Sequence, residues 1–326
     1  MSVVTLLALL LALASPAAAA ARLAPGNHDL SLTEGTGKAA RARTFIVHVP
    51  PAAGESTPLP VLVAFHGGGG NATGFQKYAG LDAIADREGV VIVYPDGTGR
   101  AGRRLLTWNA GGCCGSAQTD RVDDVGFAFA ILKKLAADLP LDPARVYVTG
   151  HSNGAMMAYR MAADASERIA AVAAVAGMMV VERFAPAQPV SVLHIHSVDD
   201  PRALYRGGLG PPFPGTDVRS RHASVEGGLA RWMIVDRCDA EPRVADSRRG
   251  SPGRVGHTAE LLVYEPCRTD AVVAHWKLTG AGHGWPGHAS PLPERIMGQD
   301  TAVIDAAEEI WKFVSRFRRA DAPPLR

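Results

Sequence analysis

The sequence predicts an α/β fold with a mostly parallel, doubly wound β-sheet. Short and continuous apolar runs recur along the chain, as strands buried on both faces of a parallel sheet require. Gly-rich turns follow many of these runs, and stretches with helical periodicity come after the turns. This alternation of strand and helix implies right-handed crossover connections, with helices on both faces of the sheet.

The elements can be placed in order along the chain. Two stretches that alternate polar and apolar residues, 28–32 and 43–49, indicate edge strands of a hairpin or meander. Continuous apolar runs predict buried strands at 60–65, 90–94, 145–149, 171–176, 190–195 and 272–278. Helical periodicity predicts helices at 75–88, 123–138, 154–165, 222–236 and 302–317. Asp123 and Asp124 fit an N-cap and a first-turn carboxylate of the second helix.

One segment interrupts the alternation of predicted strands and helices. Residues 202–221 are rich in Gly, Pro and Arg, and residues 239–257 are polar. We predict that 202–257 forms an insertion near the active site, over one end of the sheet. A separate domain is not expected, because this segment is too short for a core of its own.

The first residues predict export. An apolar run at 3–14 precedes a break at Pro16 and an alanine-rich stretch at 17–21. The run is too short to span a bilayer, so we expect a cleaved signal peptide at 1–20, with an uncleaved anchor as the alternative. The mature chain, 21–326, is then a single domain, secreted or periplasmic, without stable membrane association.

Composition excludes some functions and leaves others open. The formal net charge is +2, and no run of Lys and Arg with interleaved aromatics is visible, so we expect no nucleic-acid partner.

The cysteines are Cys113, Cys114, Cys238 and Cys267. Four cysteines allow three disulfide pairings, and the spacing is not typical of a zinc site. The oligomeric state cannot be inferred from the sequence.

The strongest chemical signal is the segment RVYVTGHSNG, residues 145–154. A predicted strand runs into G-x-S-x-G around Ser152, and a helical pattern follows at once, which is the context of the nucleophile in α/β-hydrolases. The glycines permit a very tight turn that exposes the serine Oγ. The helix N-terminus places positive potential where an oxyanion would develop.

A nucleophilic serine needs a base and a residue that orients the base. In α/β-hydrolases these residues follow in the order serine, acid, histidine. His283 lies in a Gly-rich loop after the last predicted strand and is the expected base. Among its competitors, His194, His196 and His275 lie within or beside strands and are expected to be packed, and His288 is one loop further on. Asp199 and Asp200 both follow the strand at 190–195, and their positions alone do not separate them.

The other half of an oxyanion hole is expected after an earlier strand. The strand at 60–65 ends in His66 and a run of glycines, 67–70, whose N–H groups could point at a ligand without side chains in the way. We expect the N–H groups of Asn153 and Gly68 to bind the oxyanion.

These motifs together resemble the secreted polyhydroxybutyrate depolymerase-like esterases, which are related to the feruloyl and acetylxylan esterases of carbohydrate esterase family 1. The resemblance covers about residues 43–312 and includes the pair Cys238/Cys267. The matching segments are AFHGGGGNATGF, VVIVYPDG, TWNAGGCCG, VDDVGFAFAILKKLAADLPLDPARVYVTGHSNGAMMAYRMA, LHIHSVDDP and GAGHGWPG. It implies Ser152, Asp200 and His283 as the triad. Asp200 is favoured because the acidic residue of the family directly precedes a proline.

The resemblance also bears on the cysteines. We expect a Cys238–Cys267 disulfide that ties the helix at 222–236 to the edge of the sheet beside His283. Cys113 and Cys114 are then left to each other, as a disulfide between neighbours or as two thiols. The chain departs from the family at Gly284, where a threonine is usual. The resemblance therefore does not determine the shape of the substrate pocket.

Two tryptophans lie near the expected site. Trp285 follows His283 closely and Trp108 precedes the cysteine pair, so both could line a substrate pocket. The alternative for each is core packing, since tryptophan is mostly buried.

The sequence therefore predicts a serine carboxylic-ester hydrolase that works through an acyl-enzyme and needs no metal or organic cofactor. Hydroxyalkanoate oligomers, feruloyl or acetyl esters of plant polysaccharide, and small aryl esters are all candidate substrates. Two alternatives remain: an acyltransferase with the same triad, and a catalytically silent protein that binds a polymer or carbohydrate.

Overall fold

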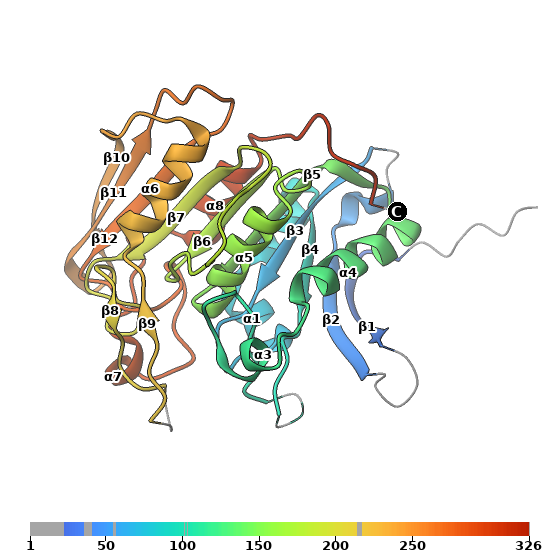
Figure 1. Cartoon of the computed structure of the whole chain (residues 1–326), viewed down its shortest axis with the longest axis horizontal. Helices are drawn as coiled ribbons and strands as arrows, with labels where there is room; N and C mark the ends of the chain where they lie inside the picture. Colours follow the sequence, from blue (N-terminus) through green and yellow to red (C-terminus); the bar gives the residue numbers. More distant parts are fainter. Residues whose placement is uncertain are drawn as a thin grey trace, which may run out of the picture.

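The computed structural model describes residues 23–35, 41–54, 57–100, 102, 104–213 and 217–325. The predicted signal peptide at 1–20 lies outside these residues. Most strands join one 10-stranded sheet, which Figure 1 shows crossing the whole molecule. In sheet order the strands are β1 (Gly26–Glu34), β2 (Arg41–Val49), β4 (Val91–Pro95), β3 (Leu59–Phe65), β5 (Leu141–His151), β6 (Ala171–Val175), β7 (Ser191–Ser197), β12 (Val273–Thr279), β11 (Arg254–Tyr264) and β10 (Arg243–Ser251).

The centre of the sheet is parallel and its two edges are antiparallel. Every neighbouring pair from β4 to β12 is parallel, whereas β1, β2 and β4 pair antiparallel at one edge and β12, β11 and β10 do so at the other. The central strands β3, β4, β6 and β7 are buried along their whole length. These are the continuous apolar runs of the sequence, because a strand covered on both faces carries apolar side chains on both.

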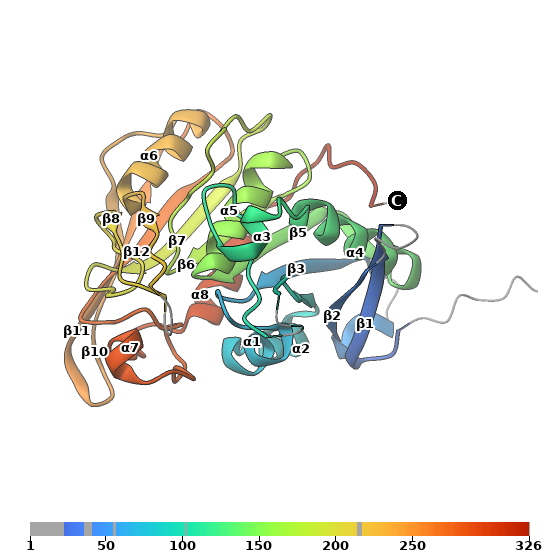
Figure 2. The same cartoon turned by 60° about the horizontal axis from the view of Figure 1, so that its bottom comes forward.

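Helices cover both faces of the sheet (Figures 1 and 2). On one face α4 (Asp124–Asp138), α5 (Asn153–Asp164) and α6 (Val225–Asp236) pack over one core cluster. On the other face α1 (Ala72–Ala79), α2 (Leu81–Glu88) and α8 (Ala306–Val314) pack over a second cluster. The predicted doubly wound α/β architecture is therefore confirmed. Within the described residues, no helix is both long enough and apolar enough to cross a bilayer.

The predicted helix at 75–88 is two helices in the structure. They meet at Gly80, whose φ of 68° is left-handed and ends α1. The ring of His288 occupies the space that a Cβ at Gly80 would take. A glycine is needed here because its missing side chain permits both the turn and the close approach of His288.

The interpretation of 202–257 as an insertion over one end of the sheet is partly wrong. The later part of this segment forms β10 and the start of β11, which extend the main sheet, with register shifts in β10 between Val244 and Asp246 and between Arg249 and Ser251. β10 is largely exposed and β11 is only partly buried, so neither carries the continuous apolar pattern that marks a strand buried on both faces. The earlier part carries β8 (Gly208–Leu209) and β9 (Arg221–His222), which pair with each other in a small separate sheet.

A buried ion pair joins the first strands to α4. Asp124 is fully buried, and its Oδ1 accepts a hydrogen bond of 2.7 Å from the guanidinium of Arg43 in β2. The N–H of Asn109 donates to the other carboxylate oxygen at 2.8 Å. Asp123, by contrast, caps the helix by accepting from the N–H of Gly126. Of the two neighbouring carboxylates, only Asp124 is part of the interior.

We predict that Asp124→Ala lowers the free energy of unfolding by about 3 kcal/mol, because it removes the fully buried partner of Arg43 and leaves only the partly exposed Glu34 to pair with this buried charge. The control is Asp123→Ala, which removes only an N-cap and should cost about 1 kcal/mol. Urea denaturation of both variants measures the difference. Equal losses would show that the ion pair is not what stabilises this junction.

Candidate active site

Ser152 lies on a sharp turn between β5 and α5. Its φ of 54° and ψ of −118° are unusual for a residue with a side chain, and its N–H donates to the carbonyl of Val175 at 2.9 Å. A Cβ on Gly150 or Gly154 would overlap backbone carbonyl oxygens, including that of Phe65 in both cases. The two glycines of the motif are therefore required by the contact between this turn and the end of β3.

Three side chains form one hydrogen-bonded chain at the carboxyl ends of the central strands. The Oγ of Ser152 lies 2.8 Å from Nε2 of His283, and Nδ1 of that histidine lies 2.7 Å from Oδ2 of Asp200. His283 and Asp200 are buried, and Ser152 is partly exposed. The structure thus brings together the residues that the sequence analysis expected as nucleophile, base and acid.

Asp200 is held from several sides. Its Oδ1 accepts from the N–H groups of Arg202 at 2.7 Å and Ala203 at 2.8 Å, and Nε2 of His196 lies 3.1 Å from its Oδ2. Burial by itself would raise the pKa of Asp200. The charge interaction with His283 and the hydrogen bonds from His196 and His283 outweigh burial and hold that pKa well below its ordinary value. Asp200 is therefore ionised at neutral pH.

Asp199 has a different environment. Its side chain is exposed, and its Oδ2 accepts from the N–H of Gly280 at 2.7 Å. The sequence positions of Asp199 and Asp200 did not separate the two, and in the structure only Asp200 contacts His283.

The loop that carries His283 is fixed by its backbone. The N–H groups of Gly282 and His283 donate to the carbonyls of Gln299 and Met297, and Nε2 of His151 lies 2.7 Å from the carbonyl of His283. Burial lowers the pKa of His151 to about 3, so the imidazole is neutral and its Nε2–H donates. The sequence analysis missed His151, although it directly precedes Ser152 in the motif.

The glycine run after β3 lies beside the Ser152 turn. Gly69 and Gly70 donate their N–H groups to the carbonyls of Leu106 and Gly67. A Cβ on Gly68 would come within 3.5 Å of the Asn153 Cβ. Across the described ranges, no protein acceptor is recorded for the N–H of Gly68 or of Asn153, the first residue of α5. Both groups are thus available to a ligand.

Trp108 is fully buried and does not wall a pocket, so that expectation is wrong. Its backbone exchanges two hydrogen bonds with the side chain of Asn153, at 2.8 and 3.1 Å, and its indole N–H donates to the carbonyl of His66 at 2.9 Å. Trp108 therefore connects the two segments that carry the N–H groups of Gly68 and Asn153.

Trp285 is also fully buried, which corrects the second expected pocket residue. Its indole N–H donates to the carbonyl of Ala79 at 3.1 Å, and its ring packs edge-on against Phe75 at 5.3 Å between centroids. The side chain anchors the loop after His283 to α1 and has no exposed surface for a substrate.

The cysteines are joined as Cys238–Cys267 and Cys113–Cys114. The first pair connects the segment after α6 to the segment before β12. The second pair lies next to Trp108, because the N–H of Cys114 donates to the Trp108 carbonyl at 3.0 Å. The neighbouring cysteines are thus part of the support around Trp108 and Asn153.

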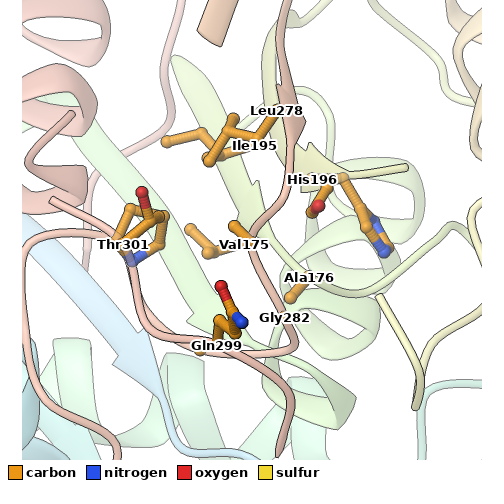
Figure 3. A pocket seen from close by; sticks show the side chains of 12 residues that line it. Val175, Ala176, Ile195, His196, Leu278, Gly282, Gln299 and Thr301 are labelled. Atoms are coloured by element: carbon orange, nitrogen blue, oxygen red, sulfur yellow. The ribbon is translucent and has the colours of Figure 1, made fainter. Parts of the chain in front are cut away.

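A small pocket lies beneath the loop that carries His283 (Figure 3). It is lined by residues at the carboxyl ends of β6, β7 and β12 and by two loops: Val175, Ala176, Ile195, His196, Ser197, Leu278, Ala281, Gly282, Gly284, Pro286, Gln299 and Thr301. Ser152 is not among these residues. This pocket therefore lies behind the histidine loop and not over the serine Oγ.

Comparison with known proteins finds matches over most of the chain. The family model described as esterase PHB depolymerase matches residues 43–226. A protein of Nocardia uniformis subsp. tsuyamanensis named as an esterase, NocK, is 29% identical over 85% of this chain and 80% of its own length. The bifunctional acetylxylan esterase/xylanase XynS20E of Neocallimastix patriciarum is 26% identical over 83% of this chain, which spans only 33% of that protein.

The fold has a counterpart among solved structures. The acetyl xylan esterase from Aspergillus awamori superposes with a TM-score of 0.51 and 14% identity, covering 84% of this chain and 94% of that one. At this identity the likeness shows the fold alone, and it agrees with the α/β-hydrolase fold expected from the sequence.

We predict that Gly154→Ala destabilises the protein by about 3 kcal/mol or more, because the added Cβ would overlap the carbonyls of Phe65 and His66. The matched control is Gly256→Ala, since a Cβ there meets no atom within 4 Å. Thermal and urea unfolding of both variants provide the measurement. If Gly154→Ala unfolds like Gly256→Ala, the close contact between β3 and the Ser152 turn is not a real constraint.

Proposed function

Because this chain belongs to the esterase PHB depolymerase family, we propose that Ser152, His283 and Asp200 are the catalytic residues of its carboxylic-ester hydrolase activity. The observation that carries the proposal is the hydrogen-bonded chain from the Oγ of Ser152 through His283 to Asp200, with distances of 2.8 and 2.7 Å. This order of contacts is the one that activates a serine hydroxyl in unrelated folds.

The geometry supports a two-step reaction. Nε2 of His283 takes the proton of Ser152 as Oγ attacks the ester carbonyl, and the ionised Asp200 stabilises the imidazolium that forms. The imidazolium then protonates the leaving alcohol, which leaves an acyl-enzyme. Water, deprotonated by the same imidazole, attacks the acyl carbon. The bond from that carbon to Oγ of Ser152 then breaks, the imidazolium returns the proton to Oγ, and the carboxylic acid leaves.

The oxyanion of each tetrahedral intermediate is assigned to the N–H groups of Asn153 and Gly68. Both donors are backbone groups of fixed direction, and Asn153 adds the positive end of α5. Trp108 supports this assignment, because it fixes the side chain of Asn153 and the carbonyl of His66 at once.

The substrate is proposed from the relatives. The family description names a PHB depolymerase, and the relatives include an acetylxylan esterase and a feruloyl esterase, so hydroxyalkanoate oligomers and acetylated or feruloylated xylan form the test set. A small aryl ester is added as a general esterase substrate. Hydrolysis rates on hydroxybutyrate trimer, acetylated xylan, methyl ferulate and p-nitrophenyl acetate would rank these classes. No hydrolysis of any of the four would refute the proposed substrate range.

We also propose that residues 1–20 are removed on export and that 21–326 is one catalytic domain, secreted or periplasmic. The support is the apolar run at 3–14 and the alanine-rich stretch behind it. Mass spectrometry of protein recovered outside the cytoplasm should find an N-terminus between Ala19 and Leu23. An intact Met1 would contradict cleavage.

We predict that Ser152→Ala lowers kcat on p-nitrophenyl acetate by about four powers of ten or more, because triad residues act as a unit. The unfolding temperature of the variant should stay near that of the wild type. A loss below about tenfold would exclude Ser152 as the nucleophile.

Asp200→Asn and Asp199→Asn form a matched pair of neighbours. We expect Asp200→Asn to lower kcat by about 10⁴-fold, because an amide cannot stabilise the imidazolium and can impose the wrong tautomer on His283. Asp199→Asn loses only an exposed contact to Gly280 and should retain activity within about tenfold of the wild type. Steady-state kinetics on one aryl ester decide between them, and the reverse ranking would assign the acid to Asp199.

A further inference from the structure

Behind Asp200 the hydrogen-bonded chain continues into the protein interior. His196 in β7 lies 3.1 Å from Asp200 through its Nε2, and its Nδ1 lies 3.0 Å from Nε2 of His194 on the same strand. Nδ1 of His194 lies 2.9 Å from the hydroxyl of Tyr159 in α5. All three side chains are buried. The esterase mechanism above gives none of them a part.

The partners of His196 fix the direction of this chain. Its Nε2 faces only acceptors, the Ala203 carbonyl at 2.8 Å and the ionised Asp200 carboxylate, so this nitrogen carries the proton. In a neutral imidazole Nδ1 is then an acceptor, and Nε2–H of His194 donates to it. Burial, with His196 and His275 nearby, keeps the pKa of His194 well below its ordinary value. His194 is therefore neutral, and its Nδ1 accepts from the Tyr159 hydroxyl.

Other polar and titratable groups surround the two histidines. On β12, His275 and Lys277 stand opposite His194 and His196 in the strand register. The Nζ of Lys277 lies 3.8 Å from Glu226 of α6, and the ring of Tyr205 meets that of His196 edge-on at 5.9 Å.

His222 of β9 interacts electrostatically with Asp200, His283 and His196, and its Nδ1 accepts from the N–H of Leu204 at 3.0 Å. The backbone N–H of Arg202 binds Asp200, while its guanidinium donates to the carbonyl of Pro212. Of the groups named here around Asp200, only His196 and His283 contact Oδ2, the oxygen that orients the base.

We propose that His196, supported by His194 and Tyr159, is a positioning residue that holds Oδ2 of Asp200 in line with His283. The inference rests on the proposed function, because it gives these residues a role only if Asp200 orients the base. His196 and His283 share one oxygen, whereas the two backbone N–H groups occupy the other. Without His196, Oδ2 is held by His283 alone, while the two backbone N–H groups still hold Oδ1.

The shared oxygen also gives a specific pH signature. The hydrogen bond from His196 withdraws negative charge from Oδ2, which weakens the stabilisation of the His283 imidazolium. Without this bond Asp200 binds the imidazolium more tightly. The acidic limb of the kcat/KM profile should therefore move to higher pH. Loss of packing alone would not move this limb.

The test compares variants at one position with a matched control. His196→Phe and His196→Asn both remove the donor to Asp200, the first by an apolar ring and the second by a side chain too short to reach Oδ2. His196→Gln keeps an N–H at about the position of Nε2. The control is His275→Phe, because His275 is equally buried on the adjacent strand and its ring nitrogens have no hydrogen-bond partner among the described residues.

We expect His196→Phe and His196→Asn to lower kcat on p-nitrophenyl acetate by about 10- to 100-fold with little change in KM. The midpoint of the acidic limb should rise by about 0.5–1 pH unit in both. His196→Gln should restore the wild-type midpoint, and His275→Phe should leave it unchanged. Tyr159→Phe, which removes only the far end of the chain, should give a smaller upward shift.

An acidic limb that stays at the wild-type pH in both His196→Phe and His196→Asn would overturn the inference, whatever the loss of kcat or of unfolding temperature. The same shift in His275→Phe would also overturn it, since it would then reflect general disturbance of the interior. A wrong proposed function would be recognised by a different result, because Ser152→Ala would then retain esterase activity. The His196 variants are interpreted as a test of positioning once Ser152→Ala is inactive.

Discussion

The arrangement of the site depends on one close backbone contact, between the Ser152 turn and the end of β3. Gly150 and Gly154 face the carbonyl of Phe65 with no room for a side chain. The contact is possible because β3 and β5 are parallel neighbours, with Phe65 paired to Gly150. The same register brings the glycine run after β3 beside Asn153 and so sets the two expected oxyanion donors next to each other.

Around this contact the polar groups form two separate supports. On one side Trp108 links the carbonyl of His66 to the side chain of Asn153 and is itself adjacent to the Cys113–Cys114 pair. On the other side the interior of β7 reaches Asp200 through His196. The Ser152 turn lies between them. A substitution at either support can therefore alter the site without touching a substrate.

Much of this arrangement could be predicted from the sequence, because parallel strands buried on both faces leave a continuous apolar pattern and the serine motif fixes its own strand–turn–helix context. The edge strand β10 and its neighbour β11 could not, since strands that are exposed or only partly buried carry many polar residues and resemble loops. The roles of Trp108 and Trp285 were misjudged for a related reason: closeness in sequence to a catalytic loop does not tell which way an indole points. His151 was missed because a hydrogen bond from a side chain to a backbone carbonyl has no signature in spacing. His196 was expected only to be packed, because a strand position does not tell which polar group a buried ring meets.

The polar edge strand β10 has a consequence for the behaviour of the molecule in a crowded solution. An unpaired strand edge is a template onto which another chain can add a strand, and proteins guard such edges with charge and irregular backbone. Here the register shifts in β10 interrupt the row of free N–H and C=O groups, and Arg243 and Arg249 stand exposed along it. At this edge the broad sheet thus ends in a strand with the features that disfavour intermolecular pairing.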